Sequence, residues 1–173
     1  TLATELNVLA DFNPVVPKEF LHADVVMLGN LHPEIQASVL DQLQGVPKLT
    51  ILDTMNYWMD HTWDSLMKVI SRVNVIAIND EEARQLTGEY SLVRAADKIT
   101  AMGPDYVVIK KGENGALLFH ERQIFFAPAL PLEEIFDPTG AGDTFAGGFA
   151  GYLTRTENIS FGNLKNAVIH GAN

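Results

Sequence analysis

The chain has 173 residues, no cysteine and a formal net charge of −10 at pH 7. This length is that of one domain with a sizeable hydrophobic core, and a chain without cysteine forms neither a disulfide framework nor a thiolate metal site. The negative charge argues against nucleic acid and anionic membranes as partners, and no apolar run reaches the roughly 18 residues of a membrane helix.

Apolar runs typical of strands alternate with stretches of helical periodicity along the chain. In chain order, the expected elements are a strand at 24–28, a helix at 33–43, a strand at 48–53, a helix at 57–73, a strand at 73–78, helices at 80–86 and 92–102, a strand at 106–110, a hairpin of 116–119 and 123–127, a helix at 142–153 and a helix from Phe161. Continuously apolar strands separated by helices indicate a mostly parallel sheet covered on both faces, which is a three-layer α/β/α fold.

Polar residues follow the strand expected at 73–78. Ligands of open parallel sheets bind at the carboxyl ends of the strands, so residues at these positions are candidates for a site. Asn79 and Glu82 have the spacing of a helix N-cap and its capping-box partner, which is a local structural role. The same two residues can also serve a site, because capping leaves both side chains at the end of the strand.

A second polar segment follows the strand at 106–110. It contains Lys110, Lys111, Gly112 and Gly115. One interpretation is a solvated turn that carries two lysines. The other is a glycine-containing loop that lines a ligand at the end of the strand.

The segment DPTGAGDTFAGGF at 137–149 is the most informative part of the chain. It places glycines and two aspartates around the start of the expected helix. Free N–H groups at a helix start, with no Cβ to crowd them, form an anion site. A carboxylate in the same turn, Asp143, can accept a proton from a hydroxyl held beside a phosphate. The segment therefore predicts phosphoryl transfer to an alcohol.

The helix after these glycines has an apolar face formed by Phe145, Phe149, Tyr152 and Leu153. Its interior also contains Gly147, Gly148 and Gly151. Each interior glycine costs a helix about 1 kcal/mol relative to alanine. We therefore expect a backbone or a ligand to approach this helix closely. The alternative is a tight helix–sheet contact with a helix cap at Asp137 or Thr139.

Other glycine motifs fit this segment poorly. A dinucleotide fingerprint needs G-x-G-x-x-G, but Phe145 stands where the third glycine belongs. A P-loop needs a lysine where Gly148 stands. The sequence contains neither G-x-S-x-G nor H-E-x-x-H. A nicotinamide-dependent oxidoreductase is therefore a weak alternative.

Residues 137–150 resemble the C-terminal signature of the ribokinase-like (PfkB) carbohydrate kinase family. By this resemblance, Asp143 is the catalytic base. Gly140, Ala141 and Gly142 donate backbone N–H groups to the charge that develops in the transition state. The implied fold is ribokinase-like, and the implied function is ATP-dependent phosphoryl transfer to a hydroxyl of a sugar or nucleoside.

The resemblance extends to other motifs and gives them roles. The Asn-x-x-Glu motif is followed by a Leu-Thr-Gly ending, and in the family its glutamate helps to order Mg²⁺, so Glu82 is the implied metal residue. The implied cofactor-binding residues are Asn79, Lys110, Gly112, Gly115, Asp137, Thr139 and Asn173. Asp53 and Asn56 resemble a family segment that often reads Asp-x-Asn-x-Arg, from which Met55 and Tyr57 depart.

The resemblance covers roughly residues 24–173. Residues 1–173 are accordingly expected to be a single α/β domain, the nucleotide-binding and catalytic part of a longer kinase truncated at both ends. The N-terminal acceptor and lid part is expected to be absent, so this part alone is expected to be inactive. The alternative function is a non-catalytic nucleotide-binding module.

The implied ligands are ATP, Mg²⁺ and a small-molecule sugar or nucleoside, whose identity stays open. Neither nucleic acid nor a membrane is an expected partner, and a homodimer stays an open alternative for the assembly. The first residues have no signal-peptide pattern, so a cytoplasmic location is expected.

Overall fold

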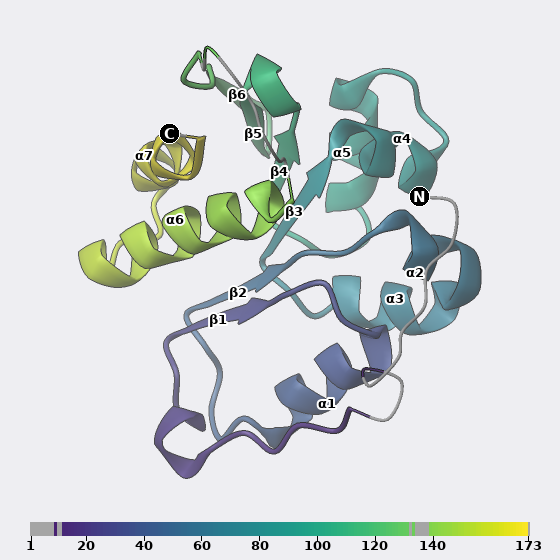
Figure 1. Cartoon of the computed structure of the whole chain (residues 1–173), viewed down its shortest axis with the longest axis vertical. Coiled ribbons are helices and arrows are strands. Elements are labelled where there is room, and N and C mark those ends of the chain that lie inside the picture. Colours follow the sequence, from purple (N-terminus) through teal and green to yellow (C-terminus); the bar gives the residue numbers. More distant parts are fainter. Residues whose placement is uncertain (1–8, 10–11, 132, 134–138, 173) are drawn as a thin grey trace.

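A sheet runs through the molecule, with helices on both of its faces (Figure 1). In the computed structural model, which describes residues 9, 12–131, 133 and 139–172, this sheet contains six strands in the order of the sequence. The strands are β1 (Val25–Leu28), β2 (Leu49–Leu52), β3 (Val75–Asn79), β4 (Tyr106–Lys110), β5 (Ala116–His120) and β6 (Gln123–Ala127). β1 to β4 are parallel, whereas β5 is antiparallel to both β4 and β6. The expected mostly parallel sheet is confirmed.

The helices create one hydrophobic core on each face of the sheet. One face is covered by α1 (Pro33–Gln42), α2 (Asn56–His61), α3 (Trp63–Ile70), α4 (Asp80–Thr87) and α5 (Leu92–Thr100), and the other by α6 (Ala141–Thr156) and α7 (Phe161–Ala172). Successive side chains of a strand point to opposite faces. In β3, Ile76 and Ile78 therefore join the first core, while Val75 and Ala77 join the second. This arrangement confirms the three-layer α/β/α architecture.

Short-range sequence signals set several boundaries of these elements. Pro33 occupies the first turn of α1, where its missing N–H leaves no intrahelical hydrogen bond unmade. Gly88 ends α4 in the left-handed conformation, with a φ of 70°. The hairpin of β5 and β6 turns at Glu121 and Arg122, and Glu121 has a φ of 51°.

One expected helix is two helices in the structure. The prediction of a helix at 57–73 is wrong at Thr62, which separates α2 from α3 with a φ of −139° and a ψ of 38°. The Thr62 hydroxyl donates to the carbonyl of Trp58 at 3.1 Å, and the Thr62 carbonyl accepts the N–H of Leu66 at 2.9 Å. Thr62 thus ends one helix and starts the next. The break lets Trp58 and Leu66 both pack in the core while Trp63 stays exposed.

The interior glycines of α6 do not share one cause. A Cβ at Gly148 would lie 2.8 Å from the carbonyl oxygen of His170 in α7, so the two backbones are in close contact there. A Cβ at Gly147 or Gly151 would meet no atom within 4 Å. The expected close approach of a backbone to this helix is therefore confirmed at Gly148, whereas Gly147 and Gly151 have open space among the described atoms. The close contact also involves Gly171 of α7, whose added Cβ would lie 2.8 Å from the carbonyl oxygen of Phe145.

Candidate functional site

A cavity of about 760 Å³ opens at the carboxyl ends of β3 and β4. The described residues that line it are Asn79, Lys110, Gly112, Glu113, Asn114, Gly115, Ala116, Ala129, Leu130, Pro131, Ala141, Gly142, Phe145, Gly171 and Ala172. They come from two strand ends, from the 3₁₀ helix at Gly112–Asn114, from the segment after β6, and from the adjacent ends of α6 and α7. The cavity thus brings together several residues that the sequence singled out in separate motifs.

The first turn of α6 forms one wall of this cavity. Its N-cap is Gly140, which has a φ of 79°, a left-handed conformation that glycine adopts without strain. The helix therefore does not begin at the polar cap that the alternative interpretation placed at Asp137 or Thr139. As a glycine, Gly140 has no side chain with which to cap the N–H groups of the first turn. Asp143 lies in the same turn and is exposed.

Lys110 lies between this turn and the end of β2. Its Nζ is 3.3 Å from Oδ1 of Asp53, and the two side chains are 17% and 9% exposed. The same Nζ is 3.4 Å from the position that a Cβ would take at Gly142. The interpretation of Lys110 as part of a solvated turn is therefore wrong. Its long side chain crosses the end of β3, so that its apolar methylene groups are covered while its ammonium contacts Asp53.

The pKa of Asp53 is raised above its ordinary value, mainly because burial disfavours the charged form. The Lys110 ammonium opposes this shift through its charge and its hydrogen bond, and so does the N–H of Thr54, which donates to Asp53 Oδ1 at 3.1 Å. The negative charge of Asp143 adds to the rise. Asp53, Lys110 and Asp143 are thus close enough to influence one another electrostatically.

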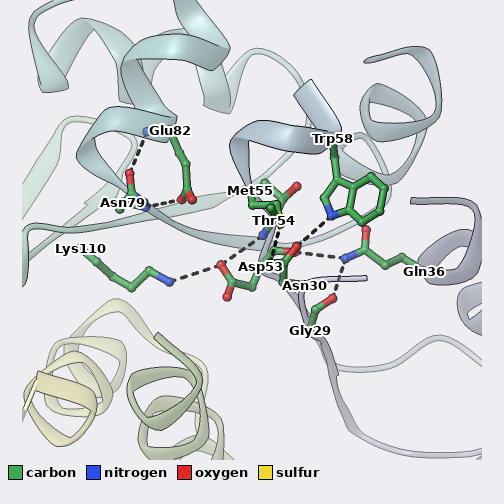
Figure 2. A network of polar contacts seen from close by, with 10 residues as sticks. All are labelled: Gly29, Asn30, Gln36, Asp53, Thr54, Met55, Trp58, Asn79, Glu82 and Lys110. Carbon is green, nitrogen blue, oxygen red and sulfur yellow. Dashed lines mark hydrogen bonds and ion pairs between the residues drawn. The ribbon is translucent and has the colours of Figure 1, made fainter. Parts of the chain in front are cut away.

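A network of hydrogen bonds holds the backbone of Asp53 in place (Figure 2). The buried side chain of Gln36 in α1 donates Nε2 to the carbonyl oxygens of Asp53 at 3.1 Å and Gly29 at 2.7 Å. The N–H of Asp53 donates to the carbonyl of Leu28 at the end of β1 at 2.9 Å. These bonds tie Asp53 to β1 and α1, so its backbone is fixed from two sides.

The same network continues into α2. The indole N–H of Trp58 donates to Oδ1 of Asn30 at 2.8 Å, and Nδ2 of Asn30 contacts the sulfur of Met55 at 3.0 Å (Figure 2). Met55 lies two residues after Asp53. The loop between β2 and α2 is therefore anchored on both sides of the Asp53 carboxylate.

Asn79 and Glu82 form the capping box that their spacing indicated (Figure 2). The N–H of Glu82 donates to Asn79 Oδ1, and the N–H of Asn79 donates to Glu82 Oε2, both at 2.8 Å. Burial raises the pKa of Glu82, and the Asn79 hydrogen bond and the charge of Lys110 partly offset the rise. The local structural role is thus confirmed, and Asn79 also lines the cavity.

Metal ligands are sparse around this cavity. The described ranges 12–131 and 139–172 contain no group of three or more histidine, aspartate or glutamate side chains that could hold a metal ion. Mg²⁺ does not require such a group, because it keeps several waters and binds through one or two carboxylates together with substrate phosphates. The carboxylate of Glu82 is a donor of this type, but it is buried, accepts the Asn79 N–H and is not among the residues that line the cavity.

Several predicted site residues lie outside the cavity wall or outside the described residues. Asp137 and Asn173 are not among the residues that the structure describes. Thr139 is exposed and directly precedes the N-cap of α6. The sequence did not predict the contact of Asp53 with Lys110, or the wall formed by Ala129, Leu130 and Pro131 after β6. The only available signal was the position of both segments at strand ends.

No helix in the described part of the chain combines the length and the apolar character that a membrane crossing requires. This agrees with the absence of a long apolar run in the sequence.

Comparisons with known proteins agree with the signature in α6. A family model described as pfkB family carbohydrate kinase matches residues 3–171. The cytidine kinase of Thermococcus kodakarensis is 39% identical over 142 residues, which are 79% of this chain and 50% of that relative.

Solved structures show the same fold. A PfkB protein from Polaromonas superposes with a TM-score of 0.71 at 22% identity, over 89% of this chain and 52% of that one. Fructokinase from Vibrio cholerae, in its fructose-, ADP- and calcium-bound form, gives a TM-score of 0.72 at 19% identity, over 95% and 55%. The chain thus spans about half the length of these relatives.

Proposed function

We propose that this chain, which belongs to the pfkB family of carbohydrate kinases, carries the nucleotide-binding and catalytic part of an ATP-dependent sugar or nucleoside kinase. One observation carries the proposal. The exposed carboxylate Asp143 lies in the first turn of α6, whose N-cap Gly140 has no side chain to cap its N–H groups, and the same turn borders a cavity lined by the half-buried Lys110. This is a base, an anion site and a ligand cavity in one place.

ATP fits the chemistry of the cavity walls. A volume of about 760 Å³ lies within the range of roughly 300–1,000 Å³ that small-molecule sites occupy. Ala129, Leu130 and Pro131 form an apolar wall suited to a nucleobase, while Lys110 and Gly142 lie where phosphates would need positive charge and N–H donors. The overall charge of −10 repels a nucleotide, so this local offset is required for binding.

The proposed transfer uses the first turn of α6 in two ways. The backbone N–H groups of Gly140, Ala141 and Gly142 donate to the oxygens of the γ-phosphoryl group and stabilise the charge that develops on them. Asp143 accepts the proton of the acceptor hydroxyl while the oxygen of that hydroxyl forms a bond to the γ-phosphorus. The bond from that phosphorus to the bridging oxygen breaks, ADP leaves, and Asp143 returns its proton to solvent.

The remaining site residues hold the nucleotide in this proposal. Gly112 and Gly115 form the loop along it, Asn79 lies at its phosphate end, and Thr139 precedes the anion site. Asp137 and Asn173 are further nucleotide-binding candidates. Glu82 would help to hold a Mg²⁺ ion, which when bound neutralises phosphate charge.

The acceptor is proposed as a class only, because the names of the relatives, such as cytidine kinase and fructokinase, refer to different acceptors. The residues that choose between them are proposed to lie in an acceptor and lid part that precedes this domain in a longer kinase. A cytoplasmic location and the lack of a nucleic-acid or membrane partner remain predictions, and so does the open question of a homodimer.

A panel of sugars and nucleosides, incubated with the complete gene product, ATP and Mg²⁺, tests the proposed activity. We expect ADP to form together with one phosphorylated acceptor, measured by coupled ADP detection and by mass of the product. ATP binding without transfer to any member of the panel would favour a non-catalytic nucleotide-binding module instead. Absence of both binding and transfer would contradict the proposal outright.

A further inference from the structure

Lys110 differs from an ordinary surface lysine in its burial and its surroundings. Of the described residues that line the cavity, it is the one that carries a positive charge. Its ammonium lies between the Asp53 carboxylate and the first turn of α6. Asp53, Asp143 and Glu82 all carry negative charge close by, and the charge of Lys110 acts on both Asp53 and Glu82. Without Lys110 this end of the cavity would repel a phosphate.

We propose that Lys110 contacts the terminal phosphoryl group of the bound nucleotide, and that Asp53 is the positioning residue that holds its ammonium at the tip of α6. This rests on the proposed function, since it requires a nucleotide in the cavity. An ammonium near the α6 N–H groups adds charge where the transferred phosphoryl group becomes more negative. Lys110 thereby supplies side-chain charge that the three backbone donors lack.

Asp53 suits the positioning role because it is itself held firmly. Its Oδ1 accepts both the Thr54 N–H at 3.1 Å and the Lys110 ammonium at 3.3 Å, and Gln36 fixes its carbonyl (Figure 2). A lysine side chain has four flexible carbons and loses that freedom when it binds a phosphate. Asp53 restricts the side chain beforehand, so less freedom remains to be lost on binding.

A purely structural ion pair is the competing explanation. The pair joins the end of β2 to the end of β4 across the intervening β3, so it could serve only to hold the strands together. That role predicts effects on stability that are independent of the ligand. A phosphate contact predicts instead that the loss of affinity grows with the number of phosphates on the ligand.

The test measures dissociation constants for AMP, ADP and a non-hydrolysable ATP analogue by calorimetry, together with kcat and KM for ATP, on the complete gene product. For Lys110→Met we expect affinity for the ATP analogue to fall about 10- to 100-fold, the range for one hydrogen bond to a charged group. Affinity for AMP should stay within about twofold, and kcat should fall. Lys110→Arg should restore part of the lost affinity. The matched control is Lys111→Met, which removes the neighbouring charge and should leave the phosphate dependence unchanged.

Asp53→Asn should change the same constants in the same direction as Lys110→Met. In the double variant Asp53→Asn with Lys110→Met, the second change should add little to the first, because both act through one ammonium. The double variant also removes both charges together, so it avoids the unpaired buried charge that could prevent Asp53→Asn alone from folding.

Three results would overturn the inference while the proposed function stands. The first is an equal loss of affinity for AMP and the ATP analogue in Lys110→Met. The second is no loss of affinity for the ATP analogue in Lys110→Met when the unmodified enzyme is active. The third is a loss of affinity in the double variant that equals the sum of the two single losses. Failure of the unmodified protein to bind any of the three nucleotides would overturn the proposed function as well, and so separates the two claims.

Discussion

The packing of α6 against α7 can be tested by adding one methyl group to α6. In Gly148→Ala the new Cβ would lie 2.8 Å from the His170 carbonyl oxygen and 3.2 Å from the Gly171 Cα, both of which belong to backbone that cannot rotate away. In Gly147→Ala, one residue earlier, the new Cβ would meet nothing within 4 Å. The two variants make the same chemical change in the same helix, so their difference isolates the contact.

The expected free energies follow from these distances. Alanine in place of glycine stabilises a helix interior by about 1 kcal/mol, and this gain applies to both variants. At Gly148 it is opposed by overpacking, which costs about 1–3 kcal/mol. We therefore expect Gly147→Ala to raise the free energy of unfolding by about 0.5–1 kcal/mol, and Gly148→Ala to lie about 1–3 kcal/mol below it. For a protein of this size each kcal/mol shifts Tm by about 2–4 °C.

Urea and thermal unfolding of the two variants measure this difference. The steric account also predicts reduced kcat for Gly148→Ala, because displacement of α6 moves the N–H groups of its first turn. If Gly148→Ala is as stabilising as Gly147→Ala, then α6 and α7 are not in backbone contact. The α6–α7 packing at Gly148 and Gly171 would then differ from that described above.

Further predictions concern the first turn of α6 and the buried carboxylate of α4. Gly140→Ala should lower the free energy of unfolding by about 1–2 kcal/mol, the cost of a left-handed conformation for a residue with a Cβ, since Gly140 has a φ of 79°. Gly162→Ala is its control, because that glycine also has open space around it but no positive φ; equal stability of the two variants in urea would contradict this reasoning. The pKa of Glu82 is raised by folding above 4.5, so its contribution to stability is fully present below its unfolded pKa and is lost as the pH rises through its folded pKa. Glu82→Gln keeps a capping-box side chain but removes this titration. Its stability relative to the unmodified protein should therefore increase as the pH rises above 4.5, and a difference that does not change with pH in urea titrations would refute the sign.

Much of the fold could be predicted because its signals are short-range. Pro33 and Gly88 mark helix ends through their own backbone preferences, and each lies at the end expected for it. The start of α6 was also predictable, since Gly140 and Gly142, which open the helix, are separated by a single residue in the sequence. The division at Thr62 was not, because it depends on how Trp58 and Leu66 both reach a core formed by distant elements.

Three predicted glycines, Gly112, Gly115 and Gly142, do line the candidate cavity, whereas the charged contacts beside it were much harder to predict. Asp53 and Lys110 are 57 positions apart, and they lie at the carboxyl ends of β2 and β4, which are not neighbours in the sheet. Their contact depends on strand order, on the reach of one side chain, and on the close approach of Gly142. The sequence placed both residues at strand ends, but strand ends alone do not tell which side chains meet. The order of the strands in the folded sheet is needed to show that Lys110, at the end of β4, contacts Asp53, which follows β2.

In the proposed reaction Asp143 removes a proton from the acceptor hydroxyl. This role is tested most directly by the kcat of Asp143→Asn in the complete gene product, measured beside the dissociation constant for ATP. Because general-base catalysis contributes about 10²- to 10⁴-fold, we predict a fall in kcat of at least that size with ATP affinity nearly unchanged. A variant that keeps its turnover would show that this carboxylate is not the base.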